Sequence, residues 1–125
     1  MAGLSRMLVG LGHDLQVISE LEKSKSLQEA NIFFTDEELK YCKTKKHPLL
    51  SLGGIFAAKE SLYKALPDQN DFYWTDVYVS HSKNGAPTLN YSGQLKQKFI
   101  ENQWISHLSI SHSGEYASAV VIISK

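Results

Sequence analysis

Carboxylate, ammonium and imidazole groups that could bind a metal ion and a phosphate occur at three separate places in this 125-residue sequence. The first is Asp14, which follows the apolar run Met7–Gly12. This run predicts a short buried strand, and an acid just past the end of a strand can point into a cleft while its backbone stays anchored. On residue type alone, an aspartate that caps a turn or a helix is the more common explanation.

The second place is the predicted helical segment 56–65, which reads Phe-Ala-Ala-Lys-Glu-Ser-Leu-Tyr-Lys-Ala. Glu60 and Lys64 are four residues apart and are therefore neighbours on one face of the helix. One interpretation is an exposed ion pair worth about 0.2–0.5 kcal/mol. The other is that the preceding apolar residues are packed, so that Glu60 is held at the edge of the core.

The third place is the sequence Leu-Ser-Ile-Ser-His-Ser that begins at Leu108. The two-residue period of a strand puts Leu108, Ile110 and His112 on one side and Ser109 and Ser111 on the other. A histidine that ends a strand among hydroxyl groups can bind an anion through its ring N–H. A hydrogen-bonded structural histidine is an equally ordinary interpretation.

The elements expected to position these residues mix helices with antiparallel strands, so the predicted fold class is α+β. Strands are predicted at residues 7–12, 72–80, 88–91, 105–111 and 116–123. Helices are predicted at residues 17–33, from Thr35 to the lysines at 43–46, at 48–66 and at 94–102.

Short sequence motifs predict where several of these helices and strands begin or end. Thr35 and Glu38 form a predicted capping box at one helix start, and Pro48 suits the first turn of the next helix. The sequence Lys-Asn-Gly that ends at Gly85 predicts a tight turn in which Asn-Gly supplies positive φ. The dipeptide at 113–114, Ser-Gly, predicts a hairpin between the last two strands.

Composition and charge narrow the class of protein. The chain carries 13 Lys and Arg against 13 Asp and Glu, so it has no broad basic field for nucleic acid. Cys42 is the only cysteine, which excludes an intrachain disulfide and a cysteine-rich zinc site. The sequence has neither a signal-peptide pattern nor an apolar run long enough for a membrane span. These features predict one soluble, cytoplasmic domain over residues 1–125.

In combination, the three places resemble a known family. The order Gly-x-Asp at Asp14, Phe-Ala-Ala-Lys-Glu-x-x-x-Lys-Ala at 56–65 and Ser-x-Ser-His at His112 resembles the holo-acyl-carrier-protein synthases, the short-chain 4'-phosphopantetheinyl transferases. Residues 34–42 resemble the second helix of that family, and Gly-Ala-Pro at 85–87 resembles its Gly-Lys-Pro turn. The resemblance extends over nearly the whole chain.

This resemblance implies a fold in which an antiparallel sheet packs with a long helix. It also implies transfer of the 4'-phosphopantetheine group from coenzyme A to a serine of an apo acyl or peptidyl carrier protein. The implied cofactor is magnesium and the second product is 3',5'-ADP. Coenzyme A and the apo carrier protein are therefore the expected partners, and the expected assembly is a homotrimer with its site at a subunit interface.

Roles for individual residues also follow from the resemblance. Asp14 and Glu60 are the expected magnesium ligands, and Glu60, or a metal-bound water beside it, is the expected base for the serine proton. Lys64 is expected to neutralise the pyrophosphate or to assist the leaving group. The expected contacts to coenzyme A are Lys64, Gly85, Pro87, Ser111 and His112.

The sequence departs from the family pattern at four positions. Glu20 stands where the family carries an arginine for carrier docking, which reverses the charge, and Lys23 or Lys25 are candidate replacements. Ile55 replaces a basic residue and Ala86 replaces the lysine of the Gly-Lys-Pro turn. Residues 66–69, Leu-Pro-Asp-Gln, replace a glycine-x-glycine loop, so that Pro67 occupies part of that loop.

These departures predict retained chemistry with altered recognition of the nucleotide and the carrier. The alternative is a non-catalytic family member that binds a carrier protein or coenzyme A. A third interpretation is an unrelated α+β interaction domain in which the motifs coincide by chance.

Overall fold

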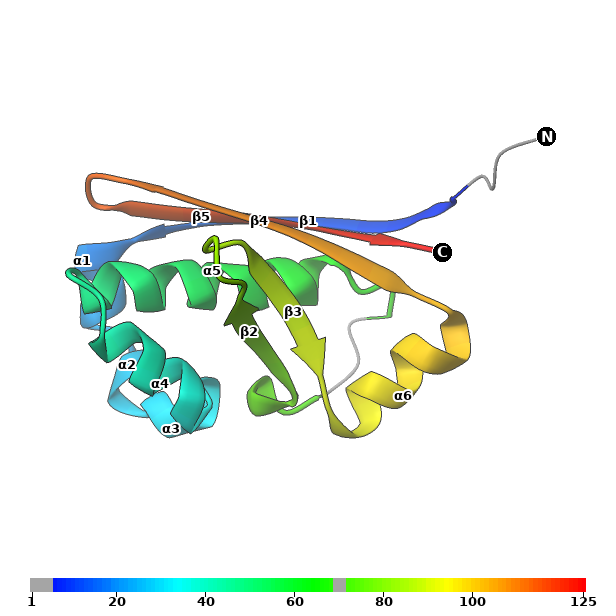
Figure 1. The fold of residues 1–125 in the computed structure, drawn as a ribbon, viewed down its shortest axis with the longest axis horizontal. Helices are drawn as coiled ribbons and strands as arrows, with labels where there is room; N and C mark the ends of the chain where they lie inside the picture. Colours follow the sequence, from blue (N-terminus) through cyan, green and yellow to red (C-terminus); the bar gives the residue numbers. More distant parts are fainter. Residues whose placement is uncertain (1–5, 69–71) are drawn as a thin grey trace.

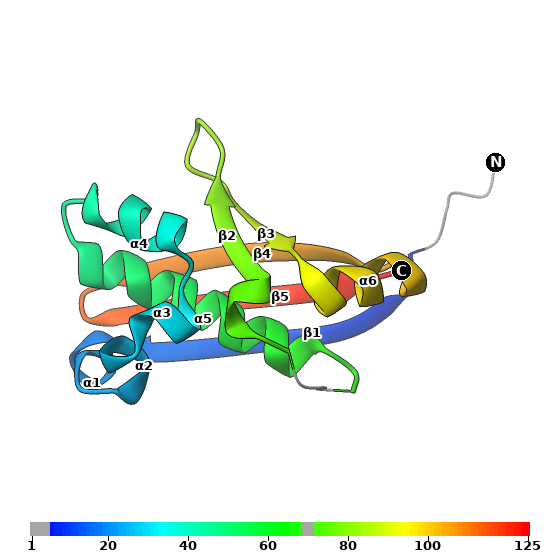
Figure 2. The ribbon, with the colours of Figure 1, turned by 90° about the horizontal axis from the view of Figure 1, so that it is seen from below.

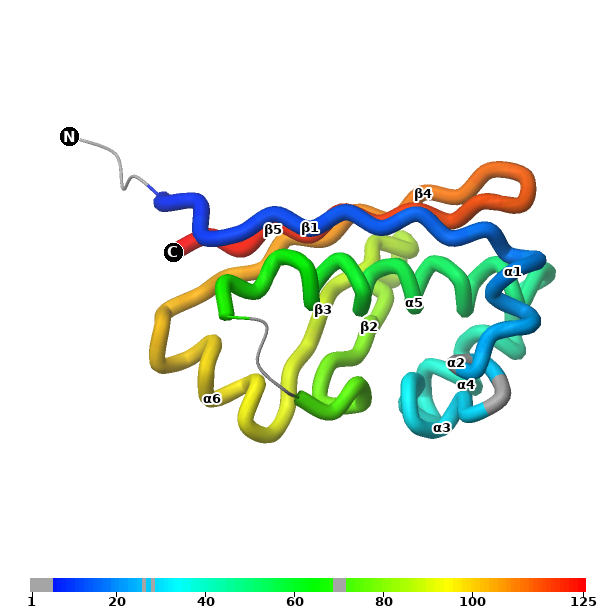
Figure 3. Tube along the Cα trace, turned by 180° about the vertical axis from the view of Figure 1, so that it is seen from behind, coloured from blue at the N-terminus to red at the C-terminus, as the bar shows by residue number. Residues whose placement is uncertain are grey.

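A computed structural model describes residues 6–68 and 72–125. Its two main layers are a three-stranded antiparallel sheet and one long helix (Figure 1). The strands are β1 (Leu8–Val17), β5 (Tyr116–Ser124) and β4 (Ile105–Ser113), in the order β1-β5-β4, and the helix is α5 (Pro48–Ala65). Within the described ranges, α5 lies along one face of the sheet and no helix covers the other face (Figure 3).

The remaining elements lie on the α5 side of the sheet (Figure 1). Four short helices are grouped at one end: α1 (Ile18–Glu22), α2 (Lys25–Gln28), α3 (Ala30–Phe33) and α4 (Asp36–Lys43). The 3-10 turn η1 (Trp74–Asp76) leads into the antiparallel pair β2 (Val77–His81) and β3 (Pro87–Tyr91), and α6 (Gly93–Asn102) lies at the other end. The α+β class is confirmed.

Two glycines of β1 allow this strand to lie directly against α5. A Cβ atom added at Gly10 would stand 1.8 Å from the carbonyl oxygen of Ala65, and one at Gly12 would stand 1.8 Å from that of Ser61. Any side chain larger than hydrogen would therefore push the strand off the helix. This close approach brings the next inward-facing residue of β1, Asp14, beside the middle of α5.

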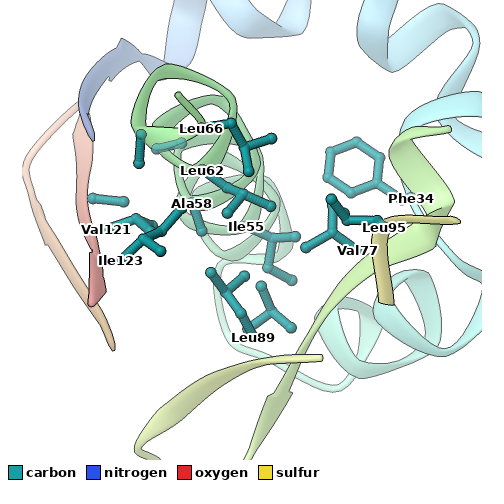
Figure 4. Close-up of a cluster of buried hydrophobic side chains, with 14 of the residues drawn as sticks. Phe34, Ile55, Ala58, Leu62, Leu66, Val77, Leu89, Leu95, Val121 and Ile123 are labelled. Carbon is teal, nitrogen blue, oxygen red and sulfur yellow. The ribbon is translucent and has the colours of Figure 1, made fainter. Parts of the chain in front are cut away.

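The hydrophobic core surrounds α5 on the side away from solvent (Figure 4). Ala57 and Ala58 are fully buried, and their small side chains let α5 approach the sheet closely. Figure 4 shows the α5 residues between β5 on one side and the α4, β2, β3 and α6 region on the other. The labelled members are Phe34, Ile55, Ala58, Leu62, Leu66, Val77, Leu89, Leu95, Val121 and Ile123.

Three of the predicted boundary signals are confirmed. The Thr35 hydroxyl accepts a hydrogen bond from the Glu38 N–H at 3.2 Å, and the Glu38 carboxylate accepts one from the Thr35 N–H at 2.9 Å. Pro48 is the first residue of α5. A two-residue turn at 114–115 joins β4 and β5 as the predicted hairpin.

The first strand is longer than predicted, and Asp14 lies within it rather than past its end. From Gly10 to Val17 the strand pairs with β5 in continuous register, with Asp14 opposite Ala119 and Val17 opposite Tyr116. The long partner strand supplies backbone hydrogen bonds that local sequence does not reveal. Asp14 therefore points toward α5 because of the strand alternation and not because of a turn.

Three other predictions are corrected. The predicted helix 17–33 is three short helices from residue 18 onward, because Ser24 (ψ 155°) and Glu29 (ψ 50°) depart from helical geometry. In the predicted strand 72–80, only residues from Val77 onward are extended in a sheet, since Trp74–Asp76 form a 3-10 turn. In the 83–85 turn, only Gly85 has positive φ, at 87°.

In the described parts of the chain, no helix combines the length and the apolarity needed to cross a bilayer.

Candidate active site

Asp14 is held by two side chains on the α5 side of β1. Its Oδ1 lies 3.1 Å from Lys64 Nζ, and its Oδ2 accepts a hydrogen bond from Gln16 Nε2 at 2.6 Å. Only 9% of the Asp14 side chain is exposed, whereas 48% of the Lys64 side chain is. Sequence analysis missed Gln16. The two-residue period would have placed it beside Asp14 if β1 had been predicted to continue.

Glu60 lies on α5 close to the Asp14 carboxylate. Burial and, second, the negative charge of Asp14 raise the pKa of Glu60 above its ordinary value, while the charge of Lys64 lowers it. The two carboxylates, from the start and the middle of the chain, are thus neighbours in space. Among residues 6–68 and 72–125, Glu60 and Lys64 do not form an ion pair with each other, because Lys64 pairs with Asp14 on β1 instead.

This donor set fits a magnesium ion. Carboxylate oxygens are ligands that Mg²⁺ prefers, and it is commonly bound by one or two carboxylates together with substrate phosphates and water. The pKa of Glu60 is raised first by burial and second by the charge of Asp14, and a bound cation would offset both effects. Over the described residues, no group of three or more His, Cys, Asp or Glu side chains is placed to hold a metal ion.

Lys59, next to Glu60, has a structural position that sequence analysis missed. Its side chain is 2% exposed, and Nζ bonds to Glu38 Oε1 at 2.7 Å, to the Phe33 carbonyl at 2.6 Å and to the Trp74 carbonyl at 3.1 Å. Glu38 also accepts a hydrogen bond from the Val79 N–H at 2.8 Å. Burial lowers the pKa of Lys59, and Glu38 opposes that shift. The network ties α5 to α4 and β2, which fixes the helix that carries Glu60.

A second group of predicted residues lines a cavity of about 370 Å³ between α5, β4 and the β2–β3 turn. His112, Gly85 and Pro87 all border it, as does Ile55. Ser111 does not, because alternation along β4 turns it to the exposed outer face of the sheet. Ser111 and His112, both predicted as coenzyme A contacts, therefore face different sides of the sheet within one chain.

The carboxylates and this cavity lie on opposite edges of the three-stranded sheet. Asp14 is on β1 and His112 is on β4, with β5 between the two strands (Figure 2). Glu60 and Lys64 belong to the β1 side, whereas Gly85 and Pro87 belong to the β4 side. The predicted site residues thus form two groups in one chain rather than one.

The four departures from the family pattern have different surroundings. Glu20 is exposed on α1, Pro67 is exposed just after α5, and Ala86 is exposed in the β2–β3 turn. Ile55 is 2% exposed and belongs to the hydrophobic core, although it also borders the cavity. The predicted loop change at 66–69 extends to Gln69, which lies outside the described residues.

Comparison with known proteins agrees with this fold. The family model described as the 4'-phosphopantetheinyl transferase superfamily matches residues 10–121. The chain therefore belongs to the 4'-phosphopantetheinyl transferase superfamily.

Among its relatives are enzymes named holo-acyl-carrier-protein synthase. Those of Trichlorobacter lovleyi and Protochlamydia amoebophila are each 35% identical to this chain over 123 residues. The alignments cover 94% of this chain, and 98% and 99% of the two relatives.

Solved structures of the same class have the same fold. The Neisseria meningitidis holo-acyl-carrier-protein synthase superimposes with a TM-score of 0.83 at 26% identity, over 95% of this chain and all of that one. A Bacillus anthracis holo-acyl-carrier-protein synthase in complex with CoA (3',5'-ADP) gives a TM-score of 0.77 at 30% identity, over 94% and 97% of the two chains.

Proposed function

We propose that this protein is a holo-acyl-carrier-protein synthase, which transfers 4'-phosphopantetheine from coenzyme A to a serine of an apo acyl or peptidyl carrier protein. The serine hydroxyl oxygen attacks the phosphorus that bears the pantetheine, and the bond from that phosphorus to the nucleotide phosphate oxygen breaks. The products are phosphopantetheinyl-serine and 3',5'-ADP. The observation that carries the proposal is the Asp14–Glu60 pair beside Lys64 in a chain of this superfamily.

Glu60 is the proposed base. Burial and the charge of Asp14 raise the pKa of Glu60 in the metal-free protein, and a bound cation would oppose that shift, so the proposed role as base rests on the position of Glu60 beside Asp14 and Lys64. Lys64 is half exposed, so its ammonium group is accessible to the negative charge that accumulates on the departing pyrophosphate oxygen. Gln16 holds the Asp14 carboxylate in one orientation through its 2.6 Å hydrogen bond.

Asp14 and Glu60 are the residues that would hold magnesium in this proposal. The chemistry that magnesium supplies when bound is neutralisation of negative charge on the pyrophosphate oxygens. Lys64 then has to exchange its contact with Asp14 for one with the phosphate, a change that its exposed position permits.

A homotrimer is part of the proposal, with each catalytic site shared between two copies. Its support is the division of the predicted site residues between the β1 and β4 edges. The sheet face away from α5 is also apolar and exposed at Leu11 (59%), Leu15 (56%) and Ile122 (36%). Such a face suits contact with further copies of the chain. The cytoplasm is the proposed location, because a single buried thiol at Cys42 suits a reducing compartment.

The test is incubation of the purified protein with coenzyme A, magnesium and a panel of apo acyl and peptidyl carrier proteins, followed by mass spectrometry of the carriers. We expect at least one carrier to gain phosphopantetheine on its serine with equal release of 3',5'-ADP. If the folded protein binds coenzyme A but modifies none of the carriers, the proposed transfer is refuted. The protein is then a non-catalytic binder of coenzyme A or of a carrier.

A further inference from the structure

Gln16 follows Asp14 by two residues on β1, so both side chains face α5. Gln16 is half-buried, and its cross-strand partner on β5 is Ala117, while the partner of Asp14 is Ala119. Both alanines are buried. Cross-strand partners point to the same face of a sheet, so these small side chains leave the space on that face to the two polar groups of β1. Asp14 and Gln16 are therefore in contact on the α5 side of the sheet.

The two oxygen atoms of Asp14 have partners of different kinds. Oδ2 accepts a hydrogen bond from Gln16 Nε2 at 2.6 Å, and Oδ1 lies 3.1 Å from Lys64 Nζ. An ionised carboxylate can only accept hydrogen bonds, so the amide presents its NH2 group and adds no charge to the site. The Lys64 ammonium is half exposed and would be repelled by a divalent cation. A cation that approaches Asp14 would therefore displace Lys64 from Oδ1 and leave Gln16 in place on Oδ2.

This difference between the two oxygens restricts how Asp14 can bind an ion. With Oδ2 engaged by Gln16, Oδ1 is the oxygen that remains for a cation. Mg²⁺ requires a near-ideal octahedral set of ligands, whereas Ca²⁺ takes six to eight oxygens and often binds both oxygens of one carboxylate. A carboxylate that offers one oxygen therefore suits Mg²⁺ better than Ca²⁺. Hydrogen-bond partners that orient a metal ligand in this way commonly contribute about 10- to 100-fold to metal affinity.

We propose that Gln16 is a positioning residue that makes the Asp14–Glu60 site selective for magnesium over calcium. It acts through Asp14, because its amide holds Oδ2 and leaves Oδ1 for the ion. The inference rests on the proposed function, since that function assigns a magnesium ion to these two carboxylates. A glutamine suits this role better than a third carboxylate would, because it orients Asp14 without adding a ligand charge that would also favour Ca²⁺.

The test compares metal affinities and does not depend on turnover. Electron paramagnetic resonance measures the Mn²⁺ left free by the protein with 3',5'-ADP, against a blank of nucleotide alone, and Mg²⁺ and Ca²⁺ then compete for the bound Mn²⁺. Gln16→Leu removes the amide donor and keeps the size of the side chain. Its Mg²⁺ affinity should fall by roughly tenfold. Its Ca²⁺ affinity should change by less than about threefold, because Ca²⁺ can take the second Asp14 oxygen that is released.

Gln16→Glu should lower the ratio of Mg²⁺ to Ca²⁺ affinity by the other route, because a third carboxylate raises the affinity for Ca²⁺ more than for Mg²⁺. Gln97→Leu is the matched control, since it makes the same change on the exposed surface of α6. Its ratio should equal that of wild type.

Gln16→Leu could instead lose affinity for both ions equally, or keep the ratio of Gln97→Leu. Either result would overturn the inference and leave Gln16 a purely structural role. A wild-type protein that binds no Mn²⁺ would overturn the metal site of the proposed function itself.

Discussion

Glu60 combines a raised pKa with a predicted role in metal binding and proton transfer. Because its folded-state pKa lies above the ordinary value of 4.5, the folded protein binds more protons than the unfolded chain between these two pKa values. The contribution of Glu60 to stability is therefore fully present below pH 4.5 and is lost as pH rises through the folded-state pKa.

Glu60→Gln should remove this dependence. Without divalent metal, the variant should gain stability relative to wild type as pH rises from about 4 to 8, because it buries no carboxylate charge and is not repelled by Asp14. Denaturant unfolding at several pH values measures the difference. The same variant should lose carrier modification by at least about 100-fold, the usual effect of removing a general base. A variant that follows the wild-type pH profile would contradict the assigned environment of Glu60.

Lys59 and Lys64 lie on the same helix, but we expect Lys59 to contribute mainly to stability and Lys64 mainly to catalysis. Lys59→Met leaves Glu38 as an uncompensated buried charge, so we expect a loss of about 3–5 kcal/mol in the free energy of unfolding. Lys64→Met breaks a half-exposed pair and should cost less than about 1 kcal/mol, yet it should slow transfer strongly. Chemical denaturation at pH 7 compares the two, and equal stabilities would contradict the burial of the Lys59 network.

At the scale of elements, the contact between β1 and α5 determines where Asp14 stands relative to Glu60. Gly12→Ala places a Cβ against the Ser61 carbonyl, so the strand must move. We expect a loss of about 1–3 kcal/mol in stability, as for other overpacked sites, together with weaker magnesium binding. Leu11→Ala, on the exposed face of the same strand, is the control for β1. A Gly12→Ala protein with wild-type stability and metal affinity would show that the helix does not set the carboxylate geometry.

The elements that sequence predicts well are those with local signals. The capping box at Thr35, the proline at the start of α5 and the hairpin at 114–115 depend on residues within a few positions of one another. The length of β1 depends instead on pairing with β5 from the far end of the chain. The same is true of Lys59, whose partners come from α3, α4 and the turn before β2. Local sequence patterns do not predict contacts between residues that are far apart in the chain.

The candidate site, like the fold, has features that local sequence predicts and features that depend on distant contacts. The motifs predict Asp14, Glu60 and Lys64, and in the structure Lys64 pairs with Asp14 while the charges of both act on Glu60. Spacing could not reveal that Lys64 pairs with Asp14 rather than with Glu60, because that depends on the glycines of β1. The roles of all these residues in metal binding and catalysis stay predictions.

At the scale of the whole molecule, one chain presents the predicted site residues in two separate groups. The β1 edge has the carboxylates and Lys64, and the β4 edge has His112 with the cavity between α5, β4 and the β2–β3 turn. A ring of copies joined head to tail would place the β1 edge of one copy against the β4 edge of the next, because such rings use two different surfaces of each chain. The central claim is that catalysis requires both edges, one from each of two copies.

Complementation between two inactive variants tests this claim most directly. Glu60→Ala and His112→Ala proteins are produced separately and together, and carrier modification is measured at equal total protein. Each variant alone should be inactive, whereas random co-assembly into rings should give about a quarter of the wild-type rate, since one junction in four unites two intact edges. A co-assembled mixture as inactive as its components would mean that both edges act within one chain, and the shared site would be wrong.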